Sequence, residues 1–275
     1  MRNVVVTGGN KGIGLAIVQA ILEEHPDELV YLGSRDATRG DEARDGLVRA
    51  HPEWKERVKV LPLDVQDDAS VAAAARSLEG TKLHGIVNNA GIARGPRREV
   101  LDVNVLGVER VCTHFLPLLE RGGRIVNVTS AAGPSWLATQ PADERRFFLD
   151  ANVTWPELRA RVEKESAVAA EENATYGLSK AFANLYTLLL AREHPELQVN
   201  ACTPGFIETD LTRGFLSSGQ SAADAGMKPP AAGARAPLFL LFGELEGTGR
   251  YYGSDAKRSP LDAYRAPGAP AYEGP

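Results

Sequence analysis

Three side chains that can hold or move a proton occur in the middle of the chain, at Ser130, Tyr176 and Lys180. Tyr176 and Lys180 are four residues apart in a helical pattern predicted over 175–192, so both project from one face of that helix. A lysine ammonium beside a phenol favours the phenolate and lowers the pKa of the phenol. The pair is therefore a candidate proton donor for reducing a carbonyl, or a base for oxidising an alcohol. Taken alone, this spacing is more often a chance feature of a helix, and a lone serine at a strand end is usually a turn residue.

A glycine-rich turn near the N-terminus indicates where a ligand would lie. The buried strand pattern Val4–Val6 is followed by glycines at 8, 9, 12 and 14 and then by an apolar helical pattern. One glycine permits the tight turn, one lets the backbone approach a pyrophosphate, and one lets the helix pack closely on the strand. The anion would then lie at the positive end of the helix dipole. The spacing is Gly-x3-Gly-x-Gly, which differs from the Gly-x-Gly-x2-Gly of the general dinucleotide fingerprint although the glycines could serve the same purposes. The alternative is a turn with a purely structural role.

The residue type after the second predicted strand, 28–33, bears on the choice of cofactor. An acid at this position accepts the 2′-hydroxyl of NAD, whereas an arginine accommodates the 2′-phosphate of NADP. Here Arg35 follows Ser34, and Lys11 in the glycine turn lies in the same neighbourhood. Two cations favour NADPH by charge-assisted pairing, although Asp36 weakens the prediction. The alternative is that Arg35 and Lys11 are only solvated surface residues.

Small and polar residues follow the next predicted strands. Asp64 ends the third strand, where it is placed to bind an adenine amino group or to cap the following helix. The run 88–91, Asn-Asn-Ala-Gly, follows the fourth strand, and small residues there suggest backbone close to a ligand. Asn104 lies inside a helical pattern that runs from Glu99 to Leu119, and asparagine is a poor residue for a helix interior.

Strand and helix patterns alternate through most of the chain, which predicts an α/β fold: one Rossmann domain with a doubly wound parallel sheet of about seven strands. We expect this domain to cover 1–258, with a helical insert at about 135–173 and an irregular Pro/Gly-rich tail at 259–275. Thr154 to Glu157 reads as a capping box that starts a helix running toward Glu172.

Composition and charge exclude several classes of protein. The 275 residues are 43% hydrophobic and 24% charged with a net charge of −5, as in an ordinary globular protein, and no basic block predicts nucleic-acid binding. Cys112 and Cys202 lack the spacing of a metal site, and no apolar run is long enough to span a membrane. We therefore expect no metal, no membrane contact, no signal peptide and a cytoplasmic location.

Taken together, these motifs occur in one order along one βα series. The glycine turn, Asn88-Asn89-Ala90-Gly91, Asn104, Ser130, Tyr176/Lys180 and Pro204-Gly205 resemble the short-chain dehydrogenase/reductase family, over roughly residues 3–253. The segments 7–18, 34–40 and 88–93, and the long insert before Tyr176, look most like the monomeric NADPH-dependent carbonyl reductases of that family.

The resemblance implies a reaction and a set of roles. Tyr176 would protonate the carbonyl oxygen while the nicotinamide delivers hydride, and Lys180 would hold the nicotinamide ribose. Ser130 would orient the carbonyl, and Asn104 would anchor a water that relays protons to Lys180. The implied cofactor contacts are Gly8, Asn10, Lys11, Gly12, Ile13, Gly14, Arg35, Asp64, Val65, Asn89, Ala90, Gly91, Tyr176, Lys180, Pro204, Gly205, Ile207 and Thr209. The implied substrate contacts are Ser130, Trp136, Tyr176 and Phe206.

Three features depart from the family pattern. The span from Gly91 to Asn104 is shorter than in these relatives, Glu208 places an acid near the nicotinamide, and the tail after Pro260 has no counterpart. Because the insert would cover the helix through which many members dimerise, we expect a monomer. The leading hypothesis is reduction of ketones, aldehydes or quinones with NADPH. Oxidation of an alcohol or hydroxysteroid with NAD(P) is the alternative, and a catalytically idle dinucleotide sensor is a third.

Overall fold

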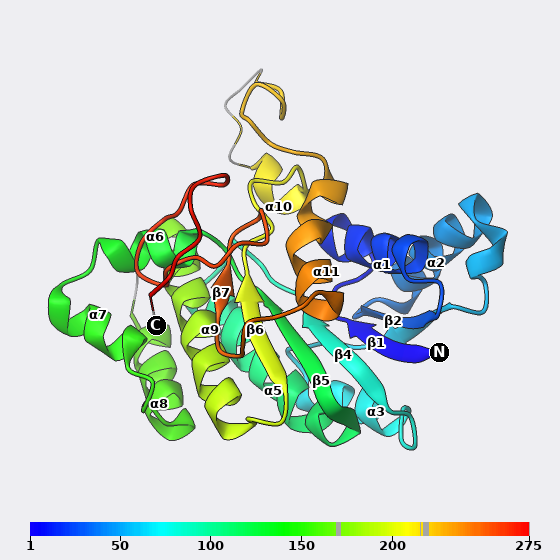
Figure 1. Ribbon diagram of the computed structural model, residues 1–275, viewed down its shortest axis with the longest axis horizontal. Helices are drawn as coiled ribbons and strands as arrows, with labels where there is room; N and C mark the ends of the chain where they lie inside the picture. The colour runs from blue at the N-terminus through cyan, green and yellow to red at the C-terminus, as the bar shows by residue number, and fades with distance from the viewer. Residues whose placement is uncertain (169–171, 215, 217–219, 275) are drawn as a thin grey trace.

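A twisted parallel β-sheet forms the centre of the protein (Figure 1). The computed structural model describes residues 1–168, 172–214, 216 and 220–274. Within these residues the sheet has seven strands in the order β3-β2-β1-β4-β5-β6-β7, all parallel. The strands are β1 (Arg2–Val6), β2 (Glu28–Ser34), β3 (Val58–Pro62), β4 (Leu83–Asn88), β5 (Leu119–Val128), β6 (Gln198–Cys202) and β7 (Tyr251–Tyr252). The predicted doubly wound parallel sheet is confirmed.

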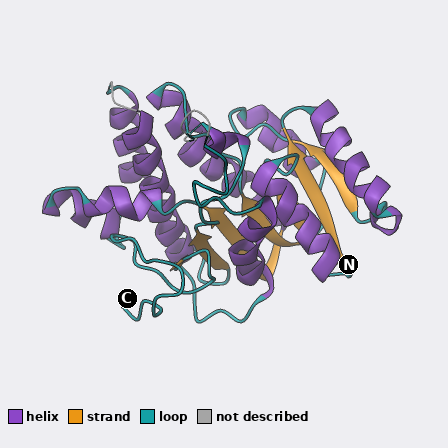
Figure 2. Cartoon of the chain, turned by 90° about the horizontal axis from the view of Figure 1, so that it is seen from above, coloured by secondary structure: helices purple, strands orange, loops and turns teal. Residues whose placement is uncertain are grey.

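Helices cover both faces of the sheet (Figure 2). On one face lie α1 (Gly12–Glu24), α2 (Ala37–Ala50) and α11 (Arg235–Phe242), and on the other lie α3 (Asp68–Arg76), α5 (Gly107–Phe115) and α9 (Glu172–Glu193). The side chains of β1 alternate between the two apolar layers: Val4 and Val6 pack under α1, and Val5 packs on the opposite side. This alternation follows from the period of two in a strand, so a run of valines is buried on both faces.

The strand order reverses at β1, which pairs with β2 on one side and β4 on the other. In an open α/β sheet a ligand binds in the crevice outside the carboxyl ends of the strands, at such a reversal. The glycine turn leaves β1 at this point, and the segments after β4, β5 and β6 leave from the same edge.

The helical segment that follows the short span from Gly91 to Asn104 differs from its prediction. The helix expected from Glu99 to Leu119 is divided into α4 (Arg97–Leu101), a π-helical turn (Asp102–Leu106) and α5. Such turns bulge the backbone and are frequent at functional sites. The π-helical turn contains Asn104, whose side chain is 1% exposed.

The insert before Tyr176 consists of α6 (Ala132–Ala138), α7 (Ala142–Leu149) and α8 (Trp155–Ser166). As predicted, Glu157 caps the start of α8, where its Oε2 accepts the N–H of Thr154 at 2.8 Å. The helix ends at Ser166 and does not reach Glu172, which is the first residue of α9. Residues 169–171 of the predicted insert lie outside the described residues.

Partly buried ion pairs hold the insert on the domain. Arg97 of α4 pairs with Glu165 of α8, and both side chains are less than one fifth exposed. Arg161 of α8 pairs with Glu165 at 3.2 Å and with Glu144 of α7 at 2.7 Å. If one of these ion pairs were broken, a partly buried charge would be left without a partner, which is costly. These ion pairs therefore oppose separation of the insert from α4.

Candidate active site

The turn between β1 and α1 depends on glycines for its backbone conformation and its close packing. Gly8 and Gly12 have φ of +62° and +55°, in the left-handed region that favours glycine. A Cβ on Gly14 would lie 2.2 Å from the carbonyl oxygen of Gly8 and 2.5 Å from Nδ2 of Asn89. The three glycines therefore permit the turn and the close helix packing that a dinucleotide cradle requires.

The segment after β4 is attached to the glycine turn by Thr7 and Asn89. The Thr7 hydroxyl accepts the backbone N–H groups of Asn89 and Ala90, each at 3.0 Å. Asn89 Nδ2 donates in return to the carbonyl oxygens of Thr7 and Gly8 at 2.9 and 3.2 Å. Sequence reasoning assigned no role to Thr7. Its signal was a hydroxyl residue directly after a buried strand.

Arg35 and Lys11 lie on the side where the adenosine phosphate was predicted. Arg35 is exposed directly after β2, while its neighbour Asp36 caps α2 by accepting the N–H of Arg39 at 3.1 Å. Lys11 forms an ion pair with Asp210 in α10 (Asp210–Arg213) at 2.9 Å, and this hydrogen bond lowers the pKa of Asp210. Lys11 and Asp210 are both more than three fifths exposed, so their pairing is weak and open to exchange.

Asp64 and Val65 follow β3. Asp64 Oδ1 accepts the N–H of Gln66 at 3.0 Å, and the cap of α3 is Asp67, which accepts the N–H of Ala69 at 3.0 Å. The predicted capping role of Asp64 is therefore wrong, because three residues separate it from the helix start. Val65 is buried, and its side chain packs at Gly107 of α5. Of the other residues predicted in the turn, Asn10 and Ile13 are half-buried.

The three predicted catalytic side chains come together at the carboxyl edge of the sheet. Ser130 follows β5, and Tyr176 and Lys180 lie on α9 beside that strand. The Ser130 side chain interacts with the Tyr176 phenol, and this interaction lowers the pKa of the phenol. Lys180 Nζ lies 5.6 Å from the centre of the Tyr176 ring and donates to the carbonyl oxygen of Val128 at 3.2 Å.

The pKa values of these groups differ from the sequence-based expectation. Burial raises the pKa of Tyr176, and the interaction with Ser130 lowers it by less, so the net shift is upward. Lys180 therefore does not give the lowered phenol pKa that its spacing predicted. Instead, burial lowers the pKa of Lys180 itself to about 8. At neutral pH the site combines a protonated phenol with a buried ammonium.

Asn104 positions the segment behind this site. Its Oδ1 accepts the N–H of Ile92 at 2.9 Å, and its Nδ2 donates to the carbonyl oxygen of Ile92 at 2.8 Å and to Ser179 Oγ at 2.9 Å. A Cβ on Gly91 would lie 3.1 Å from Asn104 Oδ1 and 3.4 Å from Lys180 Nζ. The missing side chain of Gly91 therefore leaves space between the amide and the ammonium.

The segment 203–209 after β6 reaches from the catalytic residues to the glycine turn. Gly205 has a φ of +96°, and the backbone of Phe206 and Glu208 pairs with that of Lys228 at 2.8 Å. Ile207 is buried, and a Cβ on Gly12 would lie 3.3 Å from Thr209 Cγ2. Pro204 lies between Gly205 and Thr203, two residues that line the cavity described below.

Glu208, the acid that departs from the family pattern, is half-buried and pairs with Arg213 at 3.4 Å. Its charge is therefore partly balanced by a neighbour on α10.

A cavity of about 320 Å³ opens beside Ser130. Its walls come from three parts of the chain: Ser130 and Ala131; the segment 203–206 with Gly226 and Lys228; and Ser254, Tyr264, Arg265 and Pro267. Phe206 is one of these residues, as predicted for a substrate contact. Trp136 is not among them. It packs against Gly177 of α9 and edge-on to Phe148, with ring centres 5.4 Å apart.

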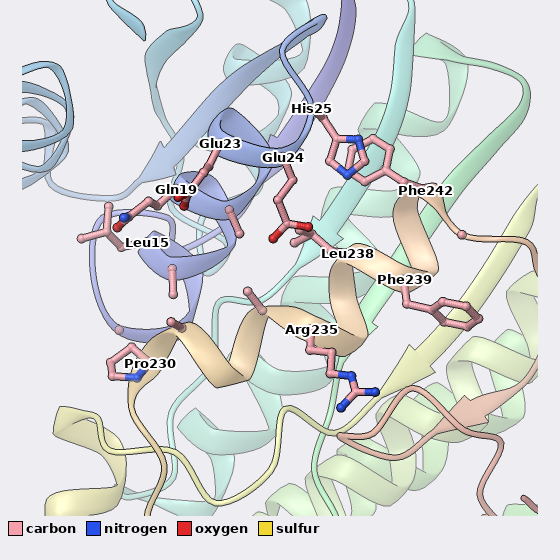
Figure 3. Close-up of a pocket in the computed structure, with 16 residues that line it drawn as sticks. Leu15, Gln19, Glu23, Glu24, His25, Pro230, Arg235, Leu238, Phe239 and Phe242 are labelled. Atoms are coloured by element: carbon pink, nitrogen blue, oxygen red, sulfur yellow. The ribbon is translucent and has the colours of Figure 1, made fainter. Parts of the chain in front are cut away.

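A second groove, of about 670 Å³, lies between α1 and α11 (Figure 3). Glu23 and Glu24 project from α1 at one wall, and Leu238 comes from α11. At its end the rings of His25 and Phe242 stack with centres 3.7 Å apart. None of the three catalytic candidates borders this groove, whereas Ser130 lines the smaller cavity and Tyr176 and Lys180 line neither.

Comparison with known proteins now identifies the family. The family model described as short chain dehydrogenase matches residues 2–142. The (+)-neomenthol dehydrogenase of Arabidopsis thaliana is 33% identical over 266 residues, which cover 81% of this chain and 89% of that protein. The chain belongs to the short-chain dehydrogenase family. Carbonyl reductase (NADPH) 1 of Homo sapiens is 32% identical to this short-chain dehydrogenase, over 86% of the chain and 89% of that protein.

A solved structure supports the same assignment. Salutaridine reductase from Papaver somniferum has a TM-score of 0.76 and is 27% identical, over 92% of this chain and 99% of that one. The resemblance found in the sequence is therefore confirmed, and this short-chain dehydrogenase is an oxidoreductase that binds a nicotinamide dinucleotide. The glycine cradle described above fits such a group. In the described part of the chain we find no cluster of metal-ligating side chains and no helix long and apolar enough to cross a membrane.

Proposed function

We propose that the protein is an NADPH-dependent carbonyl reductase that converts ketones, aldehydes or quinones to alcohols. The observation that carries this proposal is the meeting of Ser130, Tyr176 and Lys180 at one edge of the sheet, where Ser130 lines a cavity and the glycine cradle leaves the same edge. The names of relatives such as carbonyl reductase (NADPH) 1 support the same chemistry.

In this mechanism Tyr176 and Ser130 act at the carbonyl oxygen of the substrate, and Lys180 and Asn104 support Tyr176. The chemistry supplied by bound NADPH is hydride delivery to the carbonyl carbon. Tyr176 donates a proton to the oxygen, and the raised pKa of its phenol keeps that proton available at neutral pH. Ser130 donates a hydrogen bond to the same oxygen and fixes its position. Preorganised donors of this kind stabilise the charge that develops on the oxygen.

Lys180 and Asn104 restore the proton on Tyr176. The buried Lys180 ammonium lies near the phenol and would hold the ribose hydroxyls of a bound cofactor. A water in the space that Gly91 leaves between Asn104 Oδ1 and Lys180 Nζ connects the ammonium to the amide. Asn104 is a positioning residue in this scheme, since its hydrogen bonds to Ile92 and Ser179 hold the relay in place.

We further propose that NADPH is preferred over NADH. Arg35 is exposed after β2, next to the turn that cradles the pyrophosphate, and has its guanidinium available for a 2′-phosphate. Lys11 can join it by exchanging Asp210 for the phosphate, because that ion pair is exposed. The proposed contacts to the adenosine half of the cofactor also include Asn10, Ile13, Asp64 and Val65. The proposed contacts to the nicotinamide half are Pro204, Ile207 and Thr209.

The protein is proposed to act as a cytoplasmic monomer. In Figure 1 the insert helices α7 and α8 lie beside α9. Phe148 of α7 packs on Phe182 with ring centres 4.9 Å apart, and Trp155 of α8 packs on Tyr186 at 5.3 Å. This face of α9 is therefore covered by the chain itself. A mass near 29.5 kDa in sedimentation velocity supports a monomer, and twice that mass contradicts it.

The deciding experiment measures NADPH oxidation with aromatic ketones, quinones and aliphatic aldehydes, using wild type, Tyr176→Phe and Arg35→Asp. We expect Tyr176→Phe to lose turnover by a factor of about 100 or more with nearly unchanged NADPH affinity. Arg35→Asp should weaken NADPH more than NADH. Retained turnover in Tyr176→Phe contradicts the mechanism, and equal losses for the two cofactors contradict the role of Arg35. NADPH binding without turnover of any carbonyl or alcohol would indicate a sensor.

A further inference from the structure

The C-terminal segment folds back over the edge of the sheet where the catalytic residues lie. In Figure 1 this segment, drawn in red, passes close to α6, and Tyr264, Arg265 and Pro267 share one cavity with Ser130. The sequence predicted only an irregular tail here. The structure gives it turns and coil, yet it forms one wall of the pocket beside the reacting carbonyl.

A buried ion pair clamps this segment to the end of β7. The Arg265 guanidinium pairs with Asp255, and the two side chains are only 7% and 12% exposed. Arg265 also donates to Ser259 Oγ at 2.9 Å and to the carbonyl oxygen of Ala269 at 2.8 Å. The second carboxylate oxygen of Asp255 accepts the N–H of Gly268 at 2.9 Å. Both charged groups thus have several partners, which compensates their loss of hydration.

The pKa of Asp255 agrees with a tight clamp. Burial alone would raise this pKa, but the hydrogen bonds from Arg265 and from the N–H groups of Gly268 and Lys257 outweigh burial and lower it to about 2. The packing is also close, since a Cβ on Gly253 would lie 2.5 Å from Arg265 Nη2. The clamp therefore fixes the backbone on both sides of Tyr264.

Two aromatic rings stay exposed in the pocket that this clamp completes. Phe206 is 45% exposed and Tyr264 is 59% exposed. Across the described residues only five large apolar or aromatic side chains are exposed, and these two line the same cavity. Exposed apolar side chains gathered at one place typically mark a binding site, and aromatic rings select other rings by stacking and edge contacts.

We propose that Tyr264 is a specificity-determining residue, held by the Arg265–Asp255 clamp so that Tyr264 and Phe206 together favour carbonyl substrates that carry an aromatic ring. This inference rests on the proposed reductase function for its location. It adds the C-terminal segment to the substrate site and assigns a substrate class.

The test compares acetophenone with butanone in wild type, Tyr264→Ala, Tyr264→Phe and Tyr272→Ala. Tyr272 is the matched control, because it belongs to the same segment but contacts Arg258 and does not line the cavity. We expect Tyr264→Ala to raise KM for acetophenone about three- to tenfold, with kcat, KM for butanone and NADPH affinity nearly unchanged. Tyr264→Phe should keep the wild-type preference, as should Tyr272→Ala. Equal changes for the two ketones in Tyr264→Ala would overturn the inference.

A binding measurement separates this inference from the proposed function. Hydrogen–deuterium exchange of a peptide covering 260–268 is followed in the presence of NADP⁺, with and without acetophenone. We expect acetophenone to protect this peptide in wild type and not in Tyr264→Ala. Absence of turnover with every carbonyl would remove the reductase proposal, while protection would still support the aromatic site. Turnover without protection and without a change in selectivity would remove the role of Tyr264 alone.

Discussion

The two sides of the active-site edge are built in different ways. On the cofactor side, the turn between β1 and α1 is set by glycines and by hydrogen bonds of Thr7 and Asn89 to the backbone. On the substrate side, the wall made by 254–267 depends on side chains, above all on Arg265 and Asp255. A backbone cradle suits a group that is the same in every turnover, whereas a wall of side chains can change its preference without changing the fold.

One ion pair joins the glycine turn to the substrate side directly. Lys11 in the turn reaches Asp210 on α10, across the segment 203–209. Because both groups are largely exposed, solvent screens this pairing, and we expect the two sides to behave independently. Changes at Gly14, at Lys180 and at Asp210 test that independence.

The largest effect is expected at Gly14. Gly14→Ala places a Cβ against the backbone oxygen of Gly8, so either α1 or the turn must move. We expect a loss of several kcal/mol in the free energy of unfolding, and loss of NADPH binding. Urea unfolding and fluorescence titration with NADPH measure the two quantities. The control is Gly46→Ala on α2, where a Cβ meets nothing within 4 Å and the change should stabilise the protein by up to ~1 kcal/mol. Normal NADPH affinity in Gly14→Ala would show that the turn is not the cradle.

A smaller effect is expected from pH, through Lys180. Its pKa is lowered to about 8, so the ammonium is present below pH 8 and is lost as the pH rises through that value. We expect kcat/KM for carbonyl reduction to fall severalfold above pH 8, and Lys180→Met to be slow without this fall. Since the unfolded chain holds this proton up to the ordinary value of 10.5, the contribution of Lys180 to stability should rise with pH between about 8 and 10.5, measured as the difference between wild type and Lys180→Met. A wild-type rate that is constant up to pH 10 would contradict the role of the ammonium.

The smallest effect is expected at Asp210. Asp210→Asn removes the partner of Lys11, and we expect less than ~1 kcal/mol of lost stability in urea unfolding. NADPH affinity should stay the same or rise slightly, because Lys11 becomes free to pair with phosphate. A large loss of stability or of turnover would instead show that the two sides are coupled through this pair.

The sequence predicted best those features that depend on residues close together in the chain. The alternation of strand and helix patterns, the glycines of the turn and the capping box at Thr154 depend on neighbours in the chain, and the fold they predicted is confirmed. Asn104 was singled out because asparagine is unfavourable inside a helix, and the structure places it in a π-helical turn, where its side chain is hydrogen-bonded to Ile92 and Ser179.

Predictions that required knowledge of the surroundings were less accurate. The pKa of Tyr176 depends on burial as well as on the position of Lys180, and burial reverses the expected direction. Capping of α3 was one of two roles predicted for Asp64, but Asp67 caps the helix, since the exact start of α3 depends on packing. Tyr264 gave no signal, because an aromatic residue in a Pro/Gly-rich tail has no periodicity.

By itself, the sequence determined the fold, the family and the set of side chains available for proton transfer. These follow from patterns of two to four residues and from glycines whose conformations few other residues adopt. Only the tertiary structure decided which groups are buried, how their pKa values shift, and that residues 254–267 return to the site of Ser130. Burial and long-range ion pairs depend on segments that are distant along the chain, and for that reason no local pattern encodes them.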